Sequence, residues 1–60
     1  MTKIRDLKVG QKFAIIDVGI VEVVAKHIHQ GFGTVKLSYK RDDGVVISMT
    51  LDENLQIKVL

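Results

Sequence analysis

The residue types most able to do chemistry are concentrated in residues 26–33. This segment reads Lys-His-Ile-His-Gln-Gly-Phe-Gly, so a cation and two imidazoles precede an aromatic side chain that stands between two glycines. A loop of this composition is expected to project into solvent. Phe32 has little neighbouring side chain to pack on there, so it could stack on a base or fill a pocket of a partner. The alternative is that Phe32 folds back and caps one end of the fold.

The two histidines of this segment, His27 and His29, could also ligate a metal ion, because residues two apart in a strand lie on the same face. Stable sites take three or four ligands, and the spacing requires no third ligand, although Asp17 or Glu22 could supply one. Histidines at the surface of a sheet are the simpler interpretation. We therefore expect no metal ion and no other cofactor.

Four cations could form a basic stripe across neighbouring strands. Lys36 and Lys40 are expected to point outward from one strand, Arg41 follows them at a hairpin, and Lys26 is expected on the preceding strand. Phosphates would be attracted to such a stripe. The alternative is a solvated sheet face whose lysines protect an edge against aggregation. The net charge of +2 and the isoelectric point near 9.2 permit phosphate binding without requiring it.

Adjacent apolar residues occur at three points of the predicted strands, and the wall of a small barrel buries only one residue of each pair. The outer members would be Ile16, Val24 and Val46. If they cluster, they form an apolar patch suited to a protein partner or to a second copy of the chain. A slip of one residue in the predicted register would exchange the two faces and remove the patch.

The elements that must position these residues are short strands. Apolar residues recur with a period of two in runs rich in Val and Ile, which Gly, Asp and Asn separate. Residues 41–44 end in Asp-Gly, which favours a tight hairpin because this dipeptide tolerates left-handed dihedral angles. Residues 52–54 are typical of one short helical turn. The five predicted strands span residues 13–16, 20–28, 34–40, 45–51 and 55–59.

The same alternation assigns side chains to faces. In the second strand it places Ala25 on the inner face and Lys26 on the outer face. In the third strand, Tyr39 is expected inside and Ser38 outside. The core is predicted to form around Val21, Val23, Val35, Leu37, Ile47 and Ile57.

These elements predict an all-β fold, a small five-stranded antiparallel SH3-like barrel with one short helical turn before the last strand. A chain of 60 residues has room for one core, so residues 1–60 are expected to form a single domain. An OB-fold is less suitable, because only residues 41–44 lie between the third and fourth strands and leave no room for its helix.

Nearly the whole chain resembles the N-terminal domain of bacterial elongation factor P. The similar segments are Leu-Lys-Val-Gly-Gln-Lys-Phe at 7–13, Val-Glu-Val-Val at 21–24, Gly-Phe-Gly at 31–33, Val-Lys-Leu at 35–37 and Gly-Val-Val-Ile at 44–47. The resemblance implies an SH3-like barrel of the KOW type. In that family a Gly-Lys-Gly tip between the second and third strands reaches into the ribosome, and Phe32 stands at the position of its lysine. The chain also resembles short β-barrel proteins that bacteriophages encode as accessory or host-directed factors.

No residue pattern indicates catalysis. The chain contains no Cys, no Ser in a nucleophile elbow, no carboxylate pair in a recognisable cleft and no Gly-rich phosphate loop before a helix. The lack of Cys fits a cytoplasmic protein. No apolar stretch is long enough for a membrane span or a secretory signal, so we expect no contact with a membrane.

Two hypotheses follow, and both describe a non-catalytic binding module. The preferred hypothesis is a module for RNA, DNA or a ribonucleoprotein. Its candidate residues are Lys26, His27, His29, Phe32, Lys36, Lys40 and Arg41. The alternative is a protein interaction module or homodimer, such as a phage-encoded modulator of a host protein, that uses the Phe32 loop or Ile16, Val24 and Val46.

Overall fold

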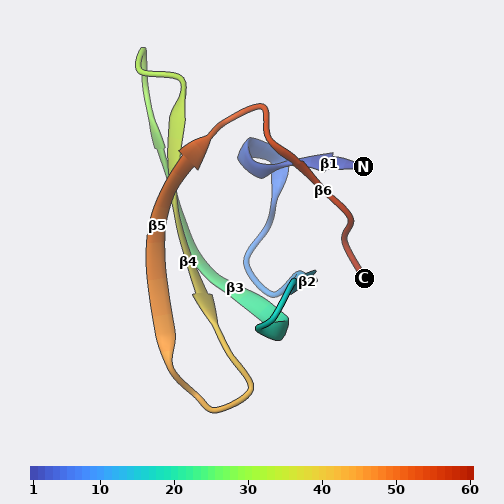
Figure 1. The fold of residues 1–60 in the computed structure, drawn as a ribbon. Helices are drawn as coiled ribbons and strands as arrows, with labels where there is room; N and C mark the ends of the chain where they lie inside the picture. Colours follow the sequence, from blue (N-terminus) through green and yellow to red (C-terminus); the bar gives the residue numbers. More distant parts are fainter.

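The computed structural model describes residues 1–60 and is all-β (Figure 1). One 3-10 helix, η1 (Ile4–Asp6), lies near the N-terminus, and no α-helix occurs. The chain therefore contains no helix with the length and apolarity needed to cross a membrane. The strands are β1 (Thr2–Lys3), β2 (Lys12–Ile15), β3 (Gly19–His29), β4 (Thr34–Lys40), β5 (Val46–Asp52) and β6 (Gln56–Ile57).

The strands form two antiparallel sheets. The larger sheet has the order β2-β3-β4-β5, and β1 pairs with β6 in the smaller one. A single bridge between Phe13 and Val59 joins the sheets, and the Leu60 N–H donates to the Lys12 carbonyl at 2.8 Å. The predicted antiparallel all-β class is confirmed, but the five predicted strands are six strands divided between two sheets.

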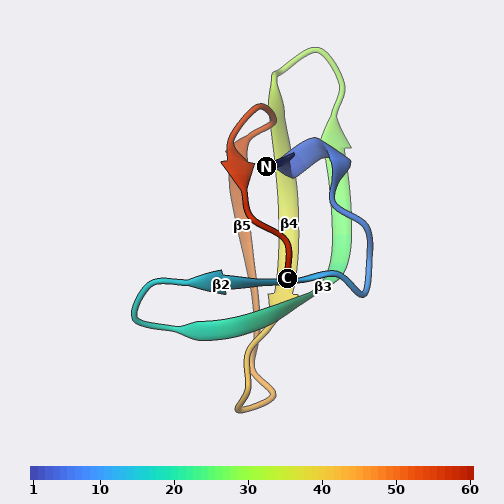
Figure 2. The same cartoon turned by 90° about the vertical axis from the view of Figure 1, so that its right-hand side faces the viewer.

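A β-bulge interrupts β3, the longest strand, which contains 11 residues. Val23 pairs with Tyr39 and Ala25 pairs with Ser38, so Val24 between them is one residue too many for the ladder. Figure 2 shows the bend that results, with the first part of β3 beside β2 and the rest beside β4. Because side chains alternate along a strand, the extra residue exchanges the two faces of β3 beyond it.

The bulge corrects the predicted faces of β3. Ala25 is exposed, although its alternation with Val21 and Val23 predicted an inner position. Lys26 was expected outside, but it pairs with the buried Leu37 and so lies on the inner side of the sheet. Simple alternation could not reveal this change, because the apolar run that contains the bulge has no Gly or polar residue to mark it.

The core lies on the concave side of the larger sheet. Phe13 and Tyr39 meet edge to face there, with ring centroids 6.3 Å apart. Ile47 and Ile57, two predicted core residues, pack against this core but are only partly buried. Ile4 and Leu7 were not predicted in the core, and η1 brings them into it. The buried residues are Ile4, Leu7, Phe13, Val21, Val23, Val35, Leu37 and Tyr39.

The hairpin between β4 and β5 forms where Asp-Gly predicts it, although only Gly44 of this dipeptide adopts the left-handed conformation. Gly44 has a φ of +86°, and its N–H donates to the Arg41 carbonyl at 3.0 Å. The Arg41 N–H in turn donates to the Val45 carbonyl at 2.9 Å, which starts the ladder between the two strands. The predicted hairpin is therefore confirmed.

The segment before β6 is a hydrogen-bonded turn, where the sequence predicted a short helical turn. The Leu55 N–H donates to the Asp52 carbonyl at 3.1 Å, and the Asp52 carboxylate accepts a bond from the Asn54 N–H at 2.8 Å. A side chain that binds the backbone locally competes with helical hydrogen bonds. This competition explains why the chain turns once and continues as β6.

Candidate functional site

The side of β3, β4 and β5 that faces away from the core is here called the outer face. Directly paired residues of an antiparallel sheet point to the same side, so the register defines this face. It contains none of the buried residues. Its rows, each read from β3 through β4 to β5, are His29-Thr34-Asp52, His27-Lys36-Thr50, Ala25-Ser38-Ser48 and Glu22-Lys40-Val46.

Both histidines lie on the outer face because of the bulge. Their rings are 5.2 Å apart at an angle of 60°, and Nδ1 of His29 lies 3.0 Å from the Thr34 hydroxyl. This hydrogen bond fixes the imidazole of His29 next to β4. No group of three or more His, Cys, Asp or Glu residues is placed to hold a metal ion.

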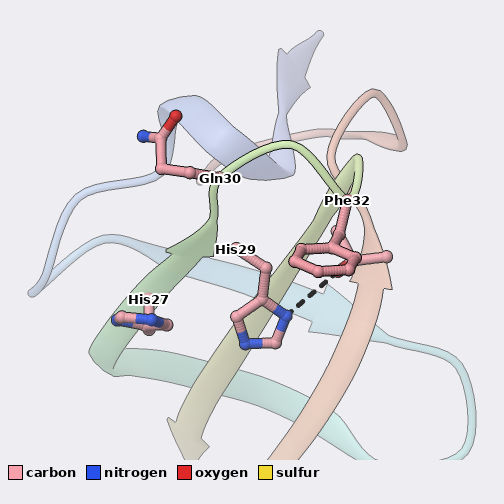
Figure 3. Close-up of a pocket in the computed structure, with 5 residues that line it drawn as sticks. His27, His29, Gln30 and Phe32 are labelled. Carbon is pink, nitrogen blue, oxygen red and sulfur yellow. Dashed lines mark hydrogen bonds between the residues drawn. The ribbon is translucent and has the colours of Figure 1, made fainter.

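Phe32 lies at the end of the same surface. It lines an open hollow of about 580 Å³ with His27, His29, Gln30 and Thr34. Figure 3 shows the three rings in the order His27, His29 and Phe32, with the Gln30 side chain directed away from them. The three aromatic side chains therefore present a row of ring surfaces at one end of the sheet.

The interpretation of Phe32 as a cap is wrong, because 81% of the residue is exposed. The loop that carries it is closed by the Phe32 N–H, which donates to the His29 carbonyl at 3.1 Å. Gly31 and Gly33 have φ angles of +81° and +70°, which side chains rarely adopt. The two glycines thus allow a tight loop whose only large side chain points into solvent.

Two of the four candidate cations lie on the outer face. Lys36 is in the row of His27, and Lys40 lies two rows further along β4. Both are exposed, and neither takes part in an ion pair. The outward direction of both lysines, which the sequence predicted, is confirmed, and Lys40 lies in the same row as the carboxylate of Glu22.

The other two cations are held elsewhere. Lys26 lies on the inner side, where its Nζ donates to the Arg5 carbonyl at 2.6 Å, so its predicted place in the outer stripe is wrong. Arg41 forms an ion pair with Asp43 in the hairpin. Hydrogen bonds from Arg41, and then from the Val45 N–H, hold the pKa of the Asp43 carboxyl below its ordinary value. The guanidinium of Arg41 is thus already paired with an anion.

The three apolar candidates come from different elements. Ile16 is 89% exposed in the turn between β2 and β3, and Val46 is 54% exposed at the start of β5. Val24 is half-buried because it is the extra residue of the bulge. Two of the three are thus as exposed as the sequence predicted.

A second apolar surface was missed at the sequence level. It is a groove of about 240 Å³ on the concave side, lined only by apolar residues, among them Ile15, Met49, Leu51 and Leu55. Met49 and Leu55 are 39% and 47% exposed. The alternation of β5 predicted the inward direction of Met49 and Leu51, but not that the opposite wall leaves them partly uncovered. This surface is called the inner groove below.

Comparisons with protein families, with curated proteins and with solved structures found no match. A fold can carry many unrelated functions, so the residues of the site, and not the fold, indicate function.

Proposed function

We propose that this chain is a non-catalytic module that binds RNA or DNA as a single strand on its outer face. The observation that carries the proposal is the register of β3 and β4, which sets His27 and His29 beside Lys36, next to the exposed ring of Phe32. Proteins that bind single strands combine stacking rings with a basic surface. Both components occur here on one side of one sheet.

The three rings would stack on bases. Outward positions along a strand recur about every 6.6 Å, so His27 and His29 offer two successive platforms and Phe32 a third. Stacking of a base on an aromatic side chain contributes about 1–3 kcal/mol. It tolerates any base, because every base has a π-face. The module would therefore bind with little sequence preference.

The lysines and hydroxyls would hold the backbone of the strand. Lys36 and Lys40 neutralise phosphates and release counterions, which makes affinity depend on salt. The hydroxyl groups of Ser38 and Ser48, which are hydrogen-bonded to each other at 2.7 Å, lie in the row between the two lysines, and Thr50 pairs with Lys36 on the same face. Hydroxyl groups commonly donate to phosphate and sugar oxygens.

We also propose that the two sheets form one SH3-like barrel of the KOW type, open between β5 and β6. Support comes from β2, which pairs with β3 on one side and meets the chain after β6 through the Phe13 and Val59 bridge. The bend of β3 lets one strand take part in both walls, as small barrels require. The resemblance to the N-terminal domain of elongation factor P agrees with this arrangement.

Fluorescence anisotropy with labelled single-stranded RNA and DNA tests the proposal. Wild-type protein should bind at about 50 mM salt and lose affinity about 7-fold toward about 200 mM, as two neutralised phosphates of a single strand predict. Phe32→Ala should weaken binding by about 5- to 150-fold, the equivalent of one lost stacking contact. Val9→Ala, a change at another exposed apolar residue, is the control and should leave affinity unchanged. Absence of binding at the lower salt concentration would contradict the proposal.

The second candidate is a module that binds a protein, such as a phage-encoded modulator of a host protein. The observation that favours it is the exposure of large apolar side chains, above all Ile16 and Phe32. Ile16→Ser should then abolish capture of the partner from a cell lysate without changing the affinity for oligonucleotides. Equal capture by wild type and variant would contradict a role of Ile16.

A further inference from the structure

The edge of β5 is the longest unpaired strand edge of the molecule. β5 is the last strand of its sheet and pairs only with β4. The opposite edge strand, β2, is covered in part by the bridge of Phe13 to Val59 and by the hydrogen bond from Leu60. In Figure 2 the turn between β2 and β3 crosses this side of β5, but Figure 1 shows the turn apart from β5, and no strand pairs with that side. The backbone groups that point away from β4 along this seven-residue strand thus remain unpaired.

The register shows which backbone groups are free. The Arg41 N–H donates to the Val45 carbonyl and the Glu53 N–H donates to the Gly33 carbonyl, at the two ends of the ladder between β4 and β5. Hydrogen-bonded pairs alternate with non-bonded pairs in an antiparallel ladder. The odd residues of β5 therefore bond to β4. The N–H groups that point away from the sheet belong to Val46, Ser48, Thr50 and Asp52.

This edge has none of the features by which proteins protect an exposed strand. It contains no Lys and no Pro, and its pairing with β4 has no bulge. Short length, lysine, proline and bulges are the common devices against edge-to-edge pairing. β1 and β6 are short, with two residues each, whereas β5 is not. An edge that is long, regular and largely uncharged is suited to accept another strand.

We propose that β5 pairs with β5 of a second copy of this chain, antiparallel and centred on Met49. Met49 is the middle residue of the strand, so this register uses its whole length. Val46 then pairs with Asp52 of the other copy, and Ser48 pairs with Thr50. All four of these residues have free N–H groups, and the Asp52 carbonyl, which already accepts the Leu55 N–H, has a second lone pair for the bond from Val46 of the other copy. The two four-stranded sheets become one continuous sheet.

The charges of β5 favour this occupant and this direction. Asp52 is the only charged residue of the strand, and it is placed beside the uncharged Val46 of the other copy. Lys40 is the neighbour of Val46 on β4, on the same face. Each Asp52 is therefore drawn toward a Lys40 of the partner, while the two Asp52 residues lie about 20 Å apart along the strands. A parallel arrangement would instead place the acidic ends together.

The inner groove supports the same arrangement. Met49 and Leu51 are partly uncovered on this side, and pairing sets Met49 of the second copy opposite Met49 and Ile47 of the second copy opposite Leu51. In Figure 2 the turn between β2 and β3 extends past β5, and Figure 1 shows this turn on the concave side. The exposed Ile16 and Val18 of this turn would thus lie beside the second copy. Apolar surface that one copy leaves exposed is covered in the dimer.

Single cysteines test the register. The chain has no Cys, so Met49→Cys introduces the only thiol. Directly opposed, non-bonded residues have Cα atoms about 4.5 Å apart, which a disulfide can span. Val46→Cys is the matched control, because the two Cys would be about 20 Å apart along the strands. Mild oxidation should join the Met49→Cys protein into a covalent dimer and leave the Val46→Cys protein monomeric. Equal cross-linking of both variants would overturn the proposal.

Light scattering on the unoxidised proteins gives a second, independent test. Wild-type protein should show twice the chain mass of 6.7 kDa at high concentration. Thr50→Pro should be monomeric, because proline removes an N–H that points away from β4 and leaves the ladder within the monomer intact. Thr50→Ala, which keeps this N–H, should remain dimeric. A monomeric wild type, or a Thr50→Pro variant that still dimerises with an unchanged circular dichroism spectrum, would overturn the proposal.

Discussion

The two phenylalanines of the chain have opposite environments, and their removal should have opposite consequences. Phe13 is 5% exposed and packs edge to face on Tyr39, whereas Phe32 is 81% exposed. Truncation of a buried Phe to Ala costs about 3–5 kcal/mol of the free energy of unfolding, because transfer energy is lost and a cavity remains. Substitution of an exposed residue that packs on nothing changes it by less than about 0.5 kcal/mol.

The size of the chain makes this difference decisive. Native proteins have a free energy of unfolding of about 0.05–0.15 kcal/mol per residue, which for this length is about 3–9 kcal/mol. Small domains bury little surface, and only 8 of the 60 residues are buried here. Phe13→Ala should therefore remove about a third of the stability at the upper end of this range and all of it at the lower end. Phe32→Ala should leave the chain as stable as the wild type.

Urea unfolding followed by circular dichroism measures both effects. The Phe32→Ala midpoint should equal that of the wild type with the same slope, and the folded baseline of Phe13→Ala should shorten or disappear. The reasoning would be refuted if Phe32→Ala lowered the free energy of unfolding by about 1.5 kcal/mol or more. Phe32 would then be packed against the protein in solution, and it could not serve as a stacking platform.

Three further predictions concern other parts of the molecule. Gly44→Ala should lower the free energy of unfolding, measured in urea, by about 1–2 kcal/mol. The cost comes from the backbone, because Gly44 has a φ of +86° and a Cβ atom at this position would meet no other atom. An unchanged unfolding midpoint would contradict the left-handed conformation of Gly44. The pKa of Asp43, measured by carbon NMR, should lie below the ordinary Asp value and rise in Arg41→Gln. Because the folded-state pKa is lowered, the stability that this pair contributes is present above the pKa of an unfolded Asp and is lost as the pH falls through the folded pKa. The position of the pair at the surface keeps the effect small, and an unmoved pKa in the variant would show that Arg41 is not its cause. Lys26→Met and Lys36→Met each remove one positive charge, from β3 and β4 respectively. Only Lys36→Met should weaken oligonucleotide binding measured by anisotropy, because Lys26 lies on the inner side of the sheet. Equal losses of affinity in the two variants would instead indicate non-specific electrostatic attraction.

Much of the sheet could be predicted because its signals are local. β4 alternates without interruption, and Val35, Leu37 and Tyr39 are buried as expected. The turn at Gly44 follows from the ability of glycine to adopt a positive φ at the end of a hairpin. The exposure of Lys36 also follows from alternation alone. These features need no knowledge of distant parts of the chain.

The remaining features depend on contacts between distant residues. Ile4 enters the core because β1 pairs with β6 across the whole chain, which no local pattern indicates. Lys26 changes sides because Ala25, and not Val24, pairs with Ser38 on the neighbouring strand. The division into two sheets depends on where β3 bends, and periodicity alone cannot locate that point. The candidate site was thus predicted in composition and only partly in position.

The bulge in β3 also has an evolutionary meaning. Deletion of Val24 would leave Ala25 directly after Val23 and keep every other pair between β3 and β4, so both imidazoles would stay on the outer face and only the bulge would be lost. One codon can thus be lost at this point without exchanging the two faces of the strand. A homologue one residue shorter here would be expected to have a straighter strand that still exposes both histidines.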